Sequence, residues 1–127
     1  MKRVLISMIV VLALSLGIAL ASSLIMRHVA LEIEDMRTDV IALVENNDAD
    51  GAAVRVTQMA DMWKKHEPML EMIAPHETLH DVTCLIVEAD ANLSARDLDD
   101  FNRSMKLLGI AIEHLFIEEQ FRLENIF

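Results

Sequence analysis

The sequence contains few cysteines and glycines, and each shortage excludes a class of structure or site. Cys84 is the only cysteine, so no intramolecular disulfide can form, although Cys84 could link two copies covalently. The three glycines, Gly17, Gly51 and Gly109, are isolated, and no glycine-rich phosphate loop or nucleotide-binding motif is present. No nucleophile triad, strand pattern or repeat is visible, which leaves helices as the building elements.

Charged residues are absent from Val4 to Met26, a stretch of 23 residues that we call the apolar run. At about 1.5 Å per residue, a helix of this length crosses a hydrocarbon core of about 30 Å. The run therefore predicts a transmembrane helix with the lipid bilayer as its partner. A cleaved signal peptide is the alternative, because Ala19-Leu20-Ala21 fits a small-x-small cleavage site. Signal-peptide cores are usually shorter than this run, which favours an uncleaved signal-anchor.

Acidic residues are absent before Glu32, and all 21 lie from there onward. Residues 27–127 carry 9 basic and 21 acidic side chains, a net charge of −12. A field of that sign repels nucleic acid, so a DNA or RNA partner is excluded. The positive charges before the apolar run, including Lys2 and Arg3, slightly outnumber those just after it. This bias predicts a single-pass protein of the cell membrane whose C-terminal domain is extracytoplasmic.

Beyond the apolar run, hydrophobic residues recur in alternating steps of three and four, the spacing of one helix face. The predicted seams are Val29, Ile33, Met36, Val40 and Leu43; Ala52, Val56, Met59, Trp63, His66, Leu70 and Ile73; Leu79, Val82, Ile86 and Ala89; and Leu98, Phe101, Met105, Leu108, Ile112 and Leu115. We expect the third helix to span His76 to Ala91 and Ser94 to cap the fourth. The short connections predict an all-α fold: an N-terminal transmembrane helix, residues 1–26, followed by an up-down helical bundle, residues 27–127.

Two of these helices carry a second stripe nearly opposite the first. On the fourth helix it comprises Leu107, Ile110, His114, Ile117 and Phe121, and on the third His80, Cys84, Val87 and Ala91. Two interpretations stay open. The stripes form an interface with a second copy or an envelope protein, or the two helices are central and buried on both sides.

Residues 76–80 form an H-E-x-x-H string within a predicted helix. This spacing places His76 and His80 on one face, where they can bind zinc while Glu77 polarises a water molecule. The H-x-x-G-x-x-H extension is missing, and nothing local selects a third ligand among Glu113, His114 and Glu118. A di-iron bundle would need a second Glu-x-x-His pair, which the chain lacks.

A second candidate metal site is the row Met59, Met62, His66 and Met69 on the second predicted helix. Thioethers together with an imidazole suit Cu(I). Methionine also fills irregular cores, especially beside a tryptophan such as Trp63. We therefore interpret the row as core packing, with Trp63 and His66 in structural roles.

The chain has a W-x-x-H element at residues 63–66 and an L-E-N-I-F ending at residues 123–127. Between them lie Leu70, Ile73, His76, Leu79 and Glu119. Together they resemble a functionally uncharacterised family of small, membrane-anchored helical proteins of bacteria. The resemblance implies an anchored helical domain and supplies no activity. It also implies that a histidine begins the third helix at the place of His76, whereas the place of His80 is usually acidic. The H-E-x-x-H string would then be peculiar to this sequence.

The expected function is a non-catalytic interaction, scaffolding or sensing module of the bacterial envelope that needs no cofactor. The alternative is a metal-dependent function. It would be either zinc hydrolysis, with His76 and His80 as ligands and Glu77 as the catalytic residue, or soft-metal binding by the methionine row.

Overall fold

One continuous helix joins the apolar run to the bundle. The computed structural model describes residues 1–126, except for the side chains of residues 119, 121–123 and 126. The helices are α1 (Lys2–Glu45), α2 (Ala49–Leu70), α3 (His76–Ser94) and α4 (Leu98–Ile126). No strand occurs within residues 1–126, so the predicted all-α fold is confirmed. The boundary expected after residue 26 falls inside α1, where the helix is unbroken.

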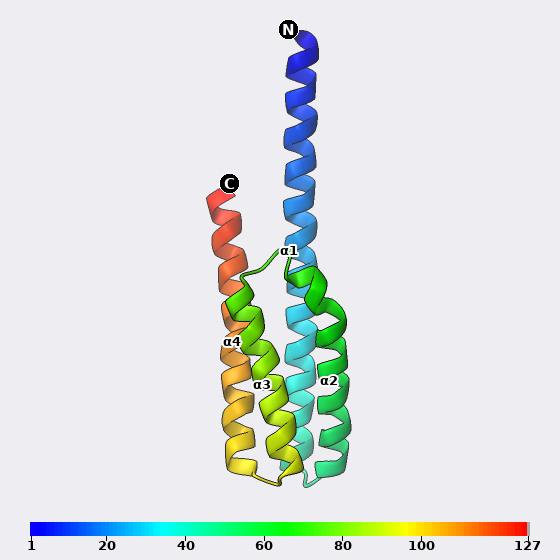
Figure 1. The fold of residues 1–127 in the computed structure, drawn as a ribbon, viewed down its shortest axis with the longest axis vertical. Coiled ribbons are helices and arrows are strands. Elements are labelled where there is room, and N and C mark those ends of the chain that lie inside the picture. The colour runs from blue at the N-terminus through cyan, green and yellow to red at the C-terminus, as the bar shows by residue number, and fades with distance from the viewer. Residues whose placement is uncertain (127) are drawn as a thin grey trace.

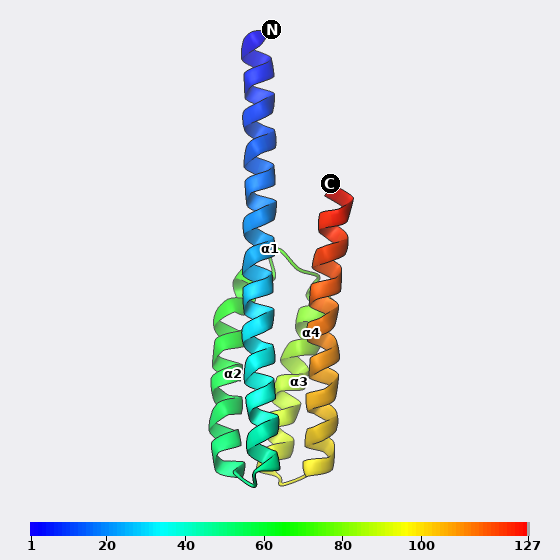
Figure 2. The same ribbon diagram turned by 180° about the vertical axis from the view of Figure 1, so that it is seen from behind.

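The helices form an up-down bundle in which each packs against two neighbours. Helices α1 and α3 each contact both α2 and α4. The α1–α2 and α3–α4 turns lie at the lower end, and the α2–α3 turn lies at the opposite, upper end (Figure 1). Helix α1 extends far beyond the upper end, and α4 extends a shorter way beside it, as the reverse view also shows (Figure 2).

The apolar run differs from the rest of α1 in its surroundings. Among the described helices, α1 is the one long and apolar enough to cross a membrane. Every residue from 1 to 15 is exposed, half-burial begins at Leu16, and Met26 is the first fully core-facing residue. The first half of the apolar run therefore has no contact with the described part of the bundle, whereas its second half is partly covered.

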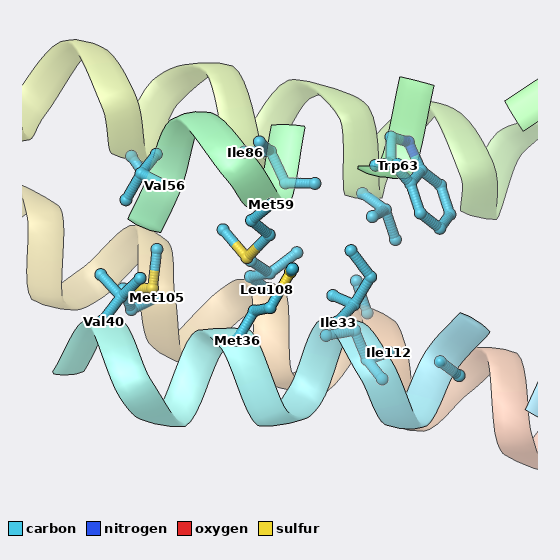
Figure 3. Close-up of a cluster of buried hydrophobic side chains, with 14 of the residues drawn as sticks. Ile33, Met36, Val40, Val56, Met59, Trp63, Ile86, Met105, Leu108 and Ile112 are labelled. Atoms are coloured by element: carbon cyan, nitrogen blue, oxygen red, sulfur yellow. The ribbon is translucent and has the colours of Figure 1, made fainter. Parts of the chain in front are cut away.

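The predicted seams meet in one core. Met36, Met59 and Leu108 lie together between α1, α2 and α4 (Figure 3). Fully buried large side chains contribute about 1.5–3 kcal/mol each, so this core is the main source of stability. The largest of them are Phe101, Ile33, Met59, Leu70, Leu79, Met105, Leu108, Ile112 and Leu115. Leu98 was wrongly placed in the seam: it is 44% exposed, because it is the first residue of α4 at the lower edge of the bundle.

The α1–α2 turn is closed by a left-handed residue and a capping aspartate. Asn47 adopts φ 60°, and the amide of Asp48 donates back to the carbonyl of Leu43 at 2.9 Å. This is the Schellman arrangement that ends many helices. Oδ1 of Asp48 then accepts from the amide of Gly51 at 2.9 Å, which caps α2. One aspartate thus ends α1 and begins α2, and the short turn makes the helices antiparallel.

The α3–α4 turn repeats this design. Arg96 adopts φ 58°, the amide of Asp97 donates to the carbonyl of Asn92 at 2.9 Å, and Oδ1 of Asp97 accepts from the amide of Asp100 at 3.2 Å. The prediction that Ser94 caps α4 is therefore wrong, since Ser94 is the last residue of α3. The Schellman turn places Ala95 and Arg96 between the two helices. The residue that caps α4 is therefore Asp97, three residues after Ser94.

The α2–α3 turn forms the upper end of the bundle. Helix α2 continues through Pro68 to Leu70, and Pro75 directly precedes α3. Between them Met72 is 84% exposed, more than any other large apolar side chain after α1 in the described part of the chain. The turn therefore presents an apolar side chain at the end from which the apolar run of α1 emerges.

Candidate functional site

The second stripes of α3 and α4 both lie on the surface, and we call their residues together the outer face; Cys84 of α3 lies beside Leu107, Ile110 and His114 of α4. On α4, Leu107, Ile110 and Ile117 are 43–55% exposed, and on α3 Val87 is 63% exposed. The remaining members His80, Cys84, Ala91 and His114 are also exposed, while the side chain of Phe121 lies outside the described residues. The interpretation that α3 and α4 are buried on both sides is therefore wrong for the described side chains. The bundle has four helices, so each keeps one side free.

A groove of about 330 Å³ runs between α3 and α4 on this outer face. It is lined by Thr78, Asp81, Cys84, Leu85, Leu107, Ile110, Ala111 and His114. Apolar side chains make up half of the lining, and one carboxylate, one thiol and one imidazole add polar groups. A shallow apolar channel between two helices is the kind of surface that accepts side chains from a third helix.

The thiol of Cys84 is exposed on the outer face. Its Sγ lies 3.5 Å from Nε2 of His80, one turn earlier on α3. Cys84 is therefore accessible to another molecule, as a covalent link between two copies requires.

His76, Glu77 and His80 of the H-E-x-x-H string are exposed in the first turns of α3. Glu118, one of the possible third ligands, accepts a hydrogen bond from Oγ1 of Thr78 at 3.0 Å. Thr78 is about 200° around the helix from His76 and from His80, so Glu118 lies on the opposite side of α3 from both imidazoles. Among the described side chains, no three His, Cys, Asp or Glu residues are grouped closely enough to hold a metal ion.

The methionine row is divided between the core and the surface. Met59 is fully buried and points toward the bundle interior (Figure 3). Met69, in contrast, is 40% exposed. His66 is half-buried, and its Nδ1–H donates to the carbonyl of Met62 at 2.8 Å. The position of Met59 is what core packing predicts, and the four side chains do not share one surface.

Trp63 is buried, with 2% of its surface exposed. Its indole Nε1–H donates to Oγ1 of Thr83 at 2.8 Å, and the Thr83 hydroxyl lies 3.0 Å from the carbonyl of Leu79. The indole thus joins α2 to α3 by a specific hydrogen bond as well as by packing. Sequence periodicity did not identify Thr83, because it lies between the core seam and the outer stripe of α3.

Arg37 joins α1 to α4 in a contact that the sequence analysis also missed. Its Nε and Nη2 donate to the carboxylate of Glu34 at 2.8 and 2.6 Å, and its Nη1 donates to the carbonyl of Met105 at 3.1 Å. The hydrogen bonds to Glu34 raise the pKa of Arg37 and outweigh the opposing effect of burial. A Cβ at Gly109 would lie 2.9 Å from Cζ of Arg37, so this glycine leaves room for the guanidinium. An isolated glycine inside a regular helical pattern was the available signal.

The chain matches one family model, described as Domain of unknown function (DUF4363), over residues 20–126. The match includes all of α2, α3 and α4 and most of α1, so the chain belongs to this family. The expected membership of an uncharacterised family is confirmed. Comparisons with curated proteins and with solved structures give no match.

Proposed function

We propose that this member of the family is a single-pass membrane protein whose bundle binds another protein through the outer face and catalyses no reaction. The arrangement of exposed apolar side chains supports this proposal. After α1, the described large apolar side chains at least 40% exposed are Val54, Met69, Met72, Val87, Leu98, Leu107, Ile110 and Ile117. Half of them belong to the outer face, and such a concentration on a folded surface is typical of an interaction site.

The membrane anchor of this proposal is α1. Residues 1–15 are all exposed, and most of them are large and apolar, so water is an unfavourable environment for them. Lys2 and Arg3 favour a cytoplasmic position for the start of α1. The bundle would then stand in the envelope, outside the cytoplasm, where it scaffolds or senses another component.

A second copy of the chain is the partner to test first. Two copies anchored in one bilayer by α1 have parallel axes, so a symmetric pair must be related by a twofold axis along the membrane normal. In such a pair the outer face of one copy meets the outer face of the other, and residues near the axis meet their own counterparts. Cys84 would then lie near Cys84 of the partner subunit. An envelope protein that fits the same groove is the other possible partner.

Sedimentation equilibrium of the full chain in a mild detergent tests self-association. We expect a concentration-dependent dimer that Ile110→Glu abolishes, because a carboxylate would be buried without a partner in the apolar interface. Val54→Glu is the matched control: Val54 is 60% exposed on α2, away from the outer face. Mild oxidation should also cross-link the dimer through Cys84.

Three results would contradict a self-associating outer face. They are a monomer at every concentration, dimerisation that Ile110→Glu leaves unchanged, and loss of the dimer in the Val54→Glu control. If the chain is a monomer, the outer face would instead bind an envelope protein. The experiment would then be to replace Ile110 with a photoreactive residue in cells, with Val54 replaced likewise as the control.

A further inference from the structure

Helices α1 and α4 run antiparallel in a register that two contacts define. Nη1 of Arg37 reaches the carbonyl of Met105, and Met26 and Leu115 line one pocket at the upper end. Between these contacts α1 moves by 11 residues and α4 by 10, so the helices advance in step. At about 1.5 Å per residue on each helix, Ile126, where α4 ends, lies level with about residue 15 of α1.

The burial pattern of α1 agrees with this register. Leu16, Ala19, Ser22 and Ser23 are half-buried at steps of three and four, in line with Met26, whereas residues 1–15 are exposed throughout. Both views of the fold show α4 beside α1 at this level, above the α2–α3 turn (Figures 1 and 2). Helix α4 therefore covers one side of the second half of the apolar run.

A bilayer would need the same part of α1. The 12 residues from Val4 to Ser15, which have no helix beside them, measure about 18 Å, well short of a hydrocarbon core of about 30 Å. About 20 residues are needed, and counted from Val4 they end near Ser23. The α4 residue level with Ser23 is Glu118. In a membrane, residues 118–126 must therefore lie within the hydrocarbon beside α1 or move away from α1.

The composition of residues 118–126 opposes insertion. Four of the nine are charged, namely Glu118, Glu119, Arg122 and Glu124. Charged side chains are costly in hydrocarbon unless they are paired or reach water. Above Ile25, separation uncovers only Leu16, Ala19 and two serines on α1, and Glu118 keeps its hydrogen bond with Thr78 when α4 bends directly after it. Lipid tails solvate such a surface about as well as another helix does.

We propose that residues 118–126 separate from α1 when it crosses a bilayer and bind the headgroup region of the leaflet on the bundle side. This inference rests on the proposed membrane anchor and adds a lipid contact to it. Aromatic, aliphatic and charged residues alternate in this segment, a mixture that suits the boundary between headgroups and acyl chains. The ligand is the zwitterionic headgroup region, since a domain of this net charge is repelled by anionic lipid.

Met72 supports this position of the bilayer surface. It lines the upper-end pocket together with Met26 and Leu115, so the α2–α3 turn lies just below the level at which the hydrocarbon must end. Its 84% exposure is unfavourable in water but favourable against acyl chains. The turn and the last residues of α4 would thus contact one membrane surface from two sides of α1.

Site-specific labelling of the full chain in phosphatidylcholine nanodiscs tests the proposal. In a Cys84→Ala background, single cysteines replace Ile9 in the apolar run, Asn125 near the end of α4, and Asp50, which is fully exposed at the lower end. A membrane-impermeant maleimide should label Asn125→Cys nearly as fast as Asp50→Cys. It should label Ile9→Cys at least about tenfold more slowly, because charged reagents do not enter hydrocarbon.

A distance measurement excludes local thinning of the bilayer around an unmoved α4. Nitroxides at Ser15→Cys and Asn125→Cys would sit on neighbouring helices at nearly the same level if α4 stayed in place. Packed helix axes are about 8–10 Å apart, so only the label arms would add to that spacing. In nanodiscs we expect the distance between the two nitroxides to be longer, and its distribution broader, than packed neighbouring helices would give.

Each outcome of these experiments decides the proposal. Protection of Asn125→Cys to the level of Ile9→Cys overturns it, as does a short distance between the two nitroxides. Rapid labelling of Ile9→Cys refutes the anchor itself, and the proposed function fails together with this inference. Protection of Ile9→Cys with protection of Asn125→Cys refutes only the separation of α4 and leaves the anchor intact.

Discussion

Replacing Thr83 with valine tests whether Trp63 is held by a hydrogen bond as well as by packing. Nε1 of Trp63 donates to Oγ1 of Thr83 at 2.8 Å, and the indole is 98% buried, so water cannot take the place of the hydroxyl. Leaving a buried donor without an acceptor costs about 1–3 kcal/mol. The hydroxyl also lies 3.0 Å from the carbonyl of Leu79, which keeps its backbone partner within α3, and 3.3 Å from Oε1 of Glu67, so these two contacts add less than the indole bond. We therefore expect Thr83→Val to lower the free energy of unfolding by about 2 kcal/mol.

A double-mutant cycle separates the hydrogen bond from the change in packing. Phenylalanine at position 63 keeps an aromatic ring but has no N–H group. In the Trp63→Phe background, Thr83→Val no longer leaves a donor unpaired and should cost less than about 1 kcal/mol. The coupling energy should therefore be about 1–2 kcal/mol, well within the range measured for contacting residues. Thr83→Ser keeps the hydroxyl and serves as the conservative control.

Urea unfolding of the full chain in a mild detergent gives the required free energies. Trp63 is the only tryptophan, so its fluorescence follows the bundle where it is present, and circular dichroism follows the Trp63→Phe variants. An equal cost of Thr83→Val in both backgrounds would refute the hydrogen bond as a source of stability. Trp63→Ala should cost about 3–5 kcal/mol in the same assay, as large-to-small core changes do. A cost below about 1 kcal/mol would show that the indole is not part of the core.

Three further predictions concern other parts of the fold. With Arg37 present, Gly109→Ala should leave the free energy of unfolding unchanged or lower it, because the new Cβ meets the guanidinium. In an Arg37→Leu background the same change should raise it by about 1 kcal/mol, since alanine favours helix more than glycine does. Equal effects in the two backgrounds in urea unfolding would show that Gly109 does not make room for Arg37. Arg96→Gly should raise the thermal midpoint, since it relieves about 1 kcal/mol of left-handed backbone strain; a decrease would mean that the arginine side chain contributes more than the strain costs. Calorimetry of the full chain with zinc should give no tight binding, and His80→Ala should not alter the result; one-to-one binding that the substitution removes would support the hydrolase alternative.

The helices were predictable because their signals are local. A seam such as Ile33, Met36 and Val40 repeats within a few residues, and a helix follows from that spacing alone. The turns were less predictable, because the same short segment offers several capping residues. Ser94 and Asp97 both suit a cap, and the choice depended on the left-handed conformation of Arg96, which the sequence does not reveal.

The candidate site was predictable in composition but not in accessibility. Periodicity identified Ile110 and Cys84 as members of second stripes, yet a stripe alone does not show whether another helix covers it. The packing of four helices in a ring leaves that side of α3 and α4 free. Contacts between distant segments could not be predicted from periodicity either. Arg37 packs beside Gly109, and most of the bundle sequence separates these two residues.

The sequence by itself determined the four helices, the uncharged run long enough to span a bilayer, and the excess of acidic side chains beyond it. These properties depend on residue spacing and composition, which a linear chain displays directly. Only the tertiary structure decided that the outer stripes are exposed, that Glu118 faces away from His76 and His80, and that α4 overlaps the second half of the apolar run. Each of these depends on the register and rotation of one helix against another, which is set by side-chain packing across the whole bundle.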